Sequence, residues 1–121
     1  HLQPNFTQAV NFIPYRGNFT RGILASVYTK FAGTKEEAVS LYKLYYSDHP
    51  FIHVIDGSLD LKQVVNTNKC ILQVEFYDGN IYIQSAIDNL LKGASGQAVQ
   101  NMNLLFGLEE RTGLKLKTVA F

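Results

Sequence analysis

The stretch from Ser85 to Gly107 passes from a strand into a helix, and this transition limits how the rest of the chain can fold. Apolar and polar residues alternate over 81–87, which is the period of a strand. The Asp88-Asn89 pair and two glycines, Gly93 and Gly96, then interrupt the alternation. The stretch therefore predicts a strand, a sharp turn and a helix that ends at Gly107. One face of that helix collects the apolar residues Ala98, Val99, Met102, Leu105 and Phe106.

The polar positions of this helix carry amides, and hardly a charge stands between Lys92 and Glu109. A helix face that only meets water usually carries Lys and Glu. Amides are better explained by hydrogen bonds to a neutral or shared partner, such as another backbone segment, another domain or a ligand. The amide residues are Gln97, Gln100, Asn101 and Asn103.

Upstream of this stretch the sequence predicts a hairpin, because Asp78-Gly79 separates two alternating runs, Lys69–Tyr77 and Asn80–Ile87. Gly22–Phe31 is the best early strand, and Ala9–Pro14 is a weaker one. Phe51–Ile55 completes the set as a short strand.

A helix is expected after Gly33, where Thr34 is a suitable N-cap and Glu37 completes a capping box. It should end before Asp48-His49-Pro50, since proline disfavours a helical residue before it. The element order is then ββαβββα, and no Gly-x-Gly-x-x-Gly follows a strand. We predict an α+β fold in which a mixed or antiparallel sheet has helices packed on one face.

The other sheet face needs cover, and three strand tyrosines, Tyr28, Tyr77 and Tyr82, bear on what provides it. Tyrosine is enriched at protein interfaces, so these residues fit a partner surface. They fit scattered surface positions equally well, and both interpretations are open at this stage.

Composition excludes several classes of function. A length of 121 residues suits a single domain, 1–121. The net charge is +1 and the 11 Lys and Arg residues are scattered, which leaves no electrostatic footprint for nucleic acid. No apolar run reaches the length of a membrane span, so a cytoplasmic setting is expected. The chain begins at His1, and we expect it to be a fragment of a longer protein.

Two arginines are candidates for binding an anion, because a planar guanidinium matches phosphate or carboxylate. Arg16 and Arg21 both lie in the glycine-containing loop before the strand that begins at Gly22. From the residues alone, a surface arginine or a structural ion pair is the favoured interpretation. Asp88-Asn89 has a similar ambiguity, since an Asx pair after a strand often only caps the following turn.

The segment Ser85–Leu108 resembles the C-terminal signature of N-acetyl-gamma-glutamyl-phosphate reductases, which reads close to S-x-I-D-N-L-x-K-G-A-x-G-Q-A-V-Q-N-x-N-L-x-x-G-L. The run R-G-I-L-A-S-V-Y, which begins at Arg21, resembles a second family segment. The resemblance implies a glyceraldehyde-3-phosphate dehydrogenase-like C-terminal domain. It also implies an enzyme of arginine biosynthesis that reduces an acyl phosphate to a semialdehyde with NADPH, through a cysteine thioester.

The same resemblance implies roles for particular residues. Arg21 is the expected substrate-binding residue, with Arg16 as the other possibility. Part of the nicotinamide pocket would come from Asn89, Lys92, Gly93, Gly96 and Gln97.

The chain would lack the Rossmann domain that binds most of the NADP, and it would lack the nucleophile. We therefore expect no catalytic residue, no metal site and no activity in residues 1–121 alone. Cys70 is expected to be a core thiol, because it shares a strand face with apolar residues. The histidines, His1, His49 and His53, match no catalytic motif.

The expected partners are the acyl-phosphate substrate, the protein's own Rossmann domain and further copies in a homo-oligomer. Two alternatives stay open: a stand-alone binding or oligomerisation module of the same fold, and a semialdehyde dehydrogenase for another acyl phosphate. The sequence leaves the N-acyl group, the choice of NADPH over NADH and the oligomer size undetermined.

Overall fold

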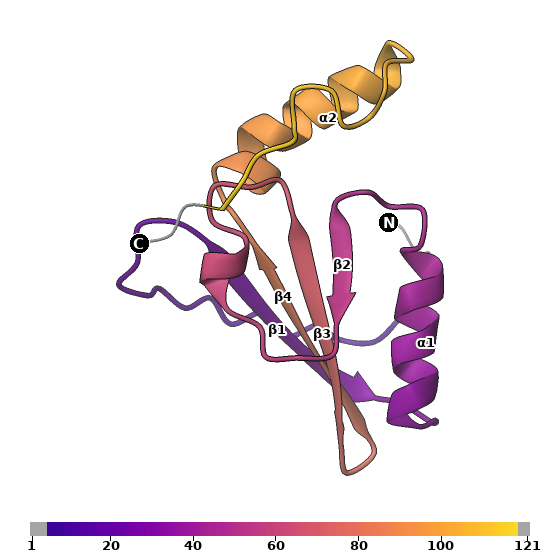
Figure 1. Cartoon of the computed structure of the whole chain (residues 1–121). Coiled ribbons are helices and arrows are strands. Elements are labelled where there is room, and N and C mark those ends of the chain that lie inside the picture. The colour runs from indigo at the N-terminus through magenta and orange to yellow at the C-terminus, as the bar shows by residue number, and fades with distance from the viewer. Residues whose placement is uncertain (1–4, 119–121) are drawn as a thin grey trace.

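The computed structural model describes residues 5–118, and His1, Val119 and Phe121 lie outside this range. Its elements follow the order β1, α1, β2, η1, β3, β4, η2 and α2 (Figure 1). The strands are β1 (Ile23–Lys30), β2 (Ile52–Ile55), β3 (Cys70–Tyr77) and β4 (Asn80–Ile87). The helices are α1 (Lys35–Tyr45), the 3₁₀ turn η1 (Leu61–Gln63), the π-helix η2 (Leu91–Ser95) and α2 (Gly96–Leu105).

The four strands form one sheet in the order β1-β4-β3-β2. β2 and β3 run parallel, whereas the other neighbours are antiparallel, so the predicted mixed sheet and α+β class are confirmed. The hairpin turn is also as predicted, because Asp78 and Gly79 both have positive φ angles, 47° and 75°. Two successive residues of this kind match the right-handed twist of the flanking strands.

The strand predicted over Ala9–Pro14 is wrong, since these residues, which lie within the described range, are neither strand nor helix. Weak alternation makes a strand only where a neighbouring strand supplies hydrogen bonds. β4 pairs with β1 from residue 23 onward, and none of the strand pairs includes 9–14. The segment is exposed along its whole length.

Helix α1 covers one face of the sheet. It begins at the predicted cap, where the N–H of Glu37 donates to Thr34 Oγ1 and the N–H of Thr34 donates to Glu37 Oε2. Its Ala38 is 1% exposed and packs against Val74 and Ile81 of the sheet. This cluster forms the core between α1 and the sheet.

The opposite face is only partly covered. Val64 packs there against Ile71 and Ala86, together with apolar residues of the connection around η1. Beyond this second cluster the face carries the three predicted tyrosines. In the strand register, Tyr28 of β1 lies directly opposite Tyr82 of β4. Tyr77 of β3 lies opposite Asn80, two residues before Tyr82 on β4, and so points to the same face. Tyr28 is 78% and Tyr77 62% exposed, whereas Tyr82 is half-buried, so two of the three residues of this tyrosine face are open to solvent.

Helix α2 extends beyond the end of the sheet, whereas α1 lies alongside the strands (Figure 1). The apolar face predicted for α2 is exposed over much of its length, with Leu105 at 81% and Phe106 at 71%. No helix within residues 5–118 has the length and apolar character needed to cross a lipid bilayer.

Candidate functional site

Sheet topology brings three chain segments together at one end of the sheet. β1 and β3 begin beside the point where β4 ends, since Ile87 pairs with both Ile23 and Cys70. The residues just outside these strand ends therefore lie close together. They are Arg21 before β1, Asn66 to Lys69 before β3, and Asp88 after β4.

Asp88 is fully buried at this end of the sheet, and its carboxylate contacts four N–H donors. Oδ1 accepts from the N–H groups of Leu90 at 2.8 Å and Leu91 at 2.9 Å. Oδ2 accepts from the N–H of Asn66 at 2.7 Å and lies 2.9 Å from Arg21 Nη2. Burial alone raises the pKa of Asp88, but these N–H donors and the guanidinium outweigh it and keep the pKa below its ordinary value.

Arg21 thus forms the ion pair that the sequence left open. Its side chain is 29% exposed, and its Nε is buried without an acceptor among the described residues. An unpaired buried N–H carries a desolvation penalty. The structure does not bring Arg16 to this site: it is exposed in the loop before Arg21, and none of the hydrogen bonds or ion pairs found within residues 5–118 includes it.

Asn89 makes the neighbouring contact. Its Oδ1 accepts from the N–H of Gly22 at 2.7 Å, which fixes the orientation of the carboxamide. Gly22 has a φ of 116°, and a Cβ there would lie 2.9 Å from Leu61 Cδ2, so glycine is required at this position. Because Oδ1 is used, Asn89 is left with its Nδ2 as the donor for another group.

Lys92 is engaged within the chain. Its Nζ donates to Gln100 Oε1 at 2.7 Å and lies 5.7 Å from the centre of the Phe51 ring. Gln100 in turn donates through Nε2 to Glu110 Oε1 at 2.6 Å. These contacts join the start of the helix to the segment that follows it.

The two glycines differ in surroundings. A Cβ at Gly96 would lie 1.6 Å from Asn68 Oδ1, so Gly96 admits the close approach of that buried side chain. A Cβ at Gly93 would meet only Ile87 Cδ1 at 3.5 Å and Asp88 O at 3.7 Å, which are ordinary contacts. Gly93 is exposed, and so is Gln97.

One of the four helix amides, Asn103, has the backbone partners that the sequence predicted, whereas Gln100 binds two charged side chains. Asn103 is 1% exposed, and its Nδ2 donates to the carbonyls of Glu110 at 3.1 Å and Thr112 at 3.0 Å. Gln100 bridges Lys92 and Glu110. These two side chains therefore fix the segment that follows α2 against the helix.

Other candidate residues lie away from this end or do not join it. Cys70 is half-buried, and its Sγ lies 3.5 Å from Ser85 Oγ. His49 stacks on Tyr45 at the end of α1. His53 is exposed, and its pKa is lowered by partial burial and by the charges of Lys69 and Arg111. Within residues 5–118 no three His, Cys, Asp or Glu residues are grouped as a metal site.

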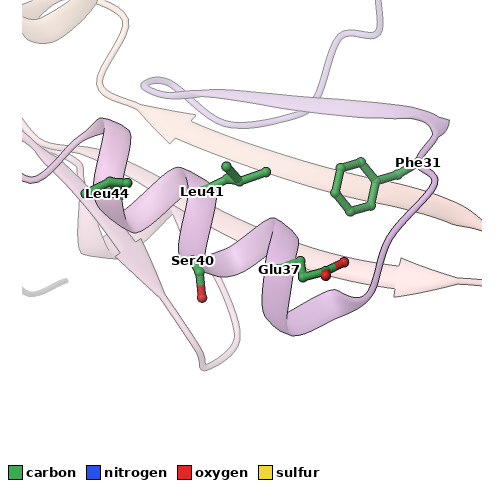
Figure 2. Close-up of a pocket in the computed structure, with 5 residues that line it drawn as sticks. All are labelled: Phe31, Glu37, Ser40, Leu41 and Leu44. Carbon is green, nitrogen blue, oxygen red and sulfur yellow. The ribbon is translucent and has the colours of Figure 1, made fainter.

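A shallow groove lies away from this site, between α1 and Phe31, the residue that follows β1. It has a volume of about 410 Å³ and is lined by Phe31, Glu37, Ser40, Leu41 and Leu44 (Figure 2). Its carboxylate, Glu37, is already used in the cap of α1. The groove is therefore mostly apolar, and its lining is poorly suited to catalysis.

Sequence reasoning missed Asn66 and Asn68. Asn66 has a φ of 62°, and its N–H binds Asp88. Asn68 is buried, donates through Nδ2 to Leu114 O at 3.1 Å and packs on Gly96. The repeated Asn in Asn66-Thr67-Asn68 was the available signal, because Asn tolerates positive φ and binds backbone groups.

The chain matches a family model described as semialdehyde dehydrogenase, dimerisation domain, over residues 1–89. It belongs to this family, and the fold agrees with that assignment. Its relatives include N-acetyl-gamma-glutamyl-phosphate reductases, which confirms the resemblance.

Two of these relatives show how far the similarity extends. The reductase of Christiangramia forsetii is 58% identical over 99% of the chain and 37% of its own length. That of Azobacteroides pseudotrichonymphae is 59% identical over 92% of the chain and 35% of its own length. The chain therefore spans little more than a third of the curated relatives it matches.

Proposed function

We propose that this chain is the C-terminal part of an N-acetyl-gamma-glutamyl-phosphate reductase that works in the cytoplasm. The reductase would convert an N-acyl-gamma-glutamyl phosphate to the N-acyl-glutamate semialdehyde. The observation that carries the proposal is the 58% identity to a named reductase over 99% of the chain. The reaction needs a cysteine nucleophile and an acid–base residue, and we assign neither to residues 1–121.

Within the proposed enzyme, Arg21 binds an anionic group of the substrate. It lies at the end of the sheet where three segments meet, and its side chain stays 29% exposed beside the ion pair with Asp88. A guanidinium has five N–H donors, so one that pairs with a carboxylate can still bind a second carboxylate or phosphate oxygen. The exposed Arg16 is the alternative, and it has no comparable support.

The residues beside Arg21 fit a nicotinamide cofactor in part. When bound, NADPH supplies the hydride for the reduction. Asn89 can donate through Nδ2, and the open surface at Gly93 and Gln97 permits close approach. Lys92 and Gly96 act less directly, because their contacts are with Gln100 and Asn68.

Two exposed surfaces fit the remaining partners. The apolar face of α2 suits contact with the Rossmann domain of the same polypeptide, since it lies at the cofactor end of the sheet. The tyrosine face suits a second copy of the chain. Its three tyrosines lie on adjacent strands, and a tyrosine supplies large contact area with few rotatable bonds.

The reductase proposal is tested with a chimera. Residues 1–121 replace the matched segment of the Christiangramia forsetii reductase, and NADPH oxidation is measured with N-acetyl-gamma-glutamyl phosphate and with aspartyl phosphate. We expect turnover of the first substrate only. A folded chimera that binds NADPH but turns over neither substrate would contradict the proposal, and so would a preference for aspartyl phosphate. The unaltered reductase is the positive control, and the chain alone should be inactive.

The tyrosine-face proposal is tested by sedimentation of the chain itself. We expect a dimer that Tyr28→Lys weakens by at least tenfold in Kd, because a buried charge without a partner is unfavourable. The matched control is Tyr45→Lys on α1, which is also exposed but lies on the other side of the sheet. A monomeric wild type, or equal effects of the two variants, would count against this surface.

A further inference from the structure

The contacts around Asp88 and Asn89 join two segments that are 67 residues apart in the chain. Arg21 Nη2 meets Asp88 Oδ2 at 2.9 Å, and the N–H of the next residue, Gly22, meets Asn89 Oδ1 at 2.7 Å. Consecutive residues of one segment therefore bind consecutive residues of the other. We call these two interactions the paired contact.

Asp88 extends the paired contact to the helix. Its second oxygen accepts from the N–H groups of Leu90 and Leu91, so one carboxylate binds the guanidinium and also caps the start of η2. A charge-assisted hydrogen bond is stronger than a neutral one, and a fully buried carboxylate with four donors has little freedom to reorient. The position of Arg21 is thus tied to the start of the helix.

We propose that Asp88 and Asn89 are positioning residues, which set the Arg21 guanidinium at a fixed place relative to the η2–α2 helix. This inference rests on the proposed function, in which Arg21 binds substrate and the start of the helix borders the cofactor. Asp88 acts through Arg21 and takes no proton in the reaction. This fixed position directs the exposed part of the Arg21 guanidinium, whose side chain is 29% exposed, toward the substrate anion.

The variant Asp88→Asn separates the ion pair from the cap. Asparagine is a good N-cap, so its oxygen can still accept from Leu90 and Leu91. Its amide nitrogen would face the donors of Asn66 and Arg21, where the second carboxylate oxygen now accepts. Asp56→Asn is the matched control, because Lys43 Nζ and Asp56 Oδ2 also lie 2.9 Å apart but in an exposed pair.

The first measurement needs no enzyme activity. In ¹⁵N NMR spectra of the chain 1–121, the Nε–H signal of Arg21 should be resolved and protected from exchange with water. We expect Asp88→Asn to accelerate that exchange by about tenfold or more, and Asp56→Asn to leave it unchanged. Equal Arg21 exchange in wild type and Asp88→Asn, with both folded, would overturn the proposal.

Asn89→Ala keeps the test decisive if Asp88→Asn does not fold. This variant removes the bond to the Gly22 N–H without leaving a buried charge. We expect faster exchange at the Gly22 amide and a shifted Arg21 Nε–H signal. An Arg21 signal that does not move would show that the contacts act independently, which contradicts joint positioning.

The second measurement uses the active chimera. We expect Asp88→Asn to lower kcat/KM about a hundredfold, chiefly through KM for the acyl phosphate, because a displaced binding group misplaces the substrate. KM for NADPH should change much less. Equal increases in both KM values would mean general loosening of the fold and would overturn the positioning role. An inactive chimera would count against the proposed function, whereas the NMR result would still decide the positioning.

Discussion

Helix α1 lies along the sheet and buries Ala38 in its core, whereas α2 extends beyond the sheet and exposes Leu105 and Phe106. α1 is stabilised by apolar packing and by its own cap. α2 is held through polar contacts, with Asp88 at the start of the helical segment and Asn103 near the end. One helix completes the core of this domain, and the other presents an apolar surface beyond it.

The difference shows what an amphipathic pattern means in each case. Both helices carry apolar residues, but only α1 packs on the sheet, through Ala38, and even there Leu41 and Leu44 stay exposed. Hydrophobic periodicity predicts that a helix face will be covered, but it does not predict which surface covers that face. The amide of Asn103 was the better guide, because it predicted hydrogen bonds to backbone, whereas Gln97 and Asn101 are exposed.

The largest expected effect is at the core beneath α1. Ile81 is 4% exposed and packs against Ala38, so Ile81→Ala should lower the free energy of unfolding by about 2–5 kcal/mol. Urea denaturation followed by circular dichroism measures this change. A loss below about 1 kcal/mol would mean that α1 is not tightly packed on the sheet and would remove the contrast between the helices.

The next effect is at the start of α2. Gly96→Ala places a methyl group where Asn68 Oδ1 lies, and we expect a destabilisation of about 1–3 kcal/mol. Gly93→Ala is the control, because its methyl group meets only ordinary contacts. Since alanine is the better helix former, that variant should be neutral or more stable by up to about 1 kcal/mol. The same loss in both variants would refute the close packing of Asn68 on Gly96.

The cap of α1 should contribute less than either packing site. Thr34→Ala removes the side-chain acceptor for the Glu37 N–H, which typically costs about 1 kcal/mol. Thermal unfolding of the variant is compared with that of Ser40→Ala, a change at an exposed position within the same helix. Thr34→Ala should have the lower Tm of the two. The reverse order would show that α1 depends on packing alone.

The smallest effect is expected on the exposed face of α2. Leu105 is 81% exposed, so Leu105→Ala should change the stability of the chain by less than about 0.5 kcal/mol. The same substitution in the active chimera should destabilise the enzyme more, because the Rossmann domain would cover this face. A loss of 2 kcal/mol in the isolated chain would mean that α2 is already packed.

Local signals in the sequence were sufficient for the hairpin and for α1. Asp78-Gly79 fixes its own turn, and Thr34 caps its own helix, so neither needs a distant partner. Capping by Asp88 was likewise predictable from its place after a strand. The weak strand at 9–14 failed because strand formation depends on a neighbour that the sequence does not show.

The contacts between distant segments were beyond this reasoning. Whether Arg21 pairs with Asp88 depends on which strands become neighbours, and residue spacing does not reveal this. Asn66 and Asn68 contribute through contacts 22 and 46 residues away. The roles of Arg21, Asn89 and the two glycines in binding stay predictions.

The paired contact also has a consequence for the order of folding. Arg21 and Asp88 can meet only after β1 has docked on β4, which closes the long loop between Lys30 and its strand partner Asn80. Long-range closures of this kind come late, because chain entropy opposes them until local hairpins have formed. The β3–β4 hairpin should therefore form early and the Arg21 site late. A nascent chain would place Arg21 beside Asp88 only once β1 had joined the sheet.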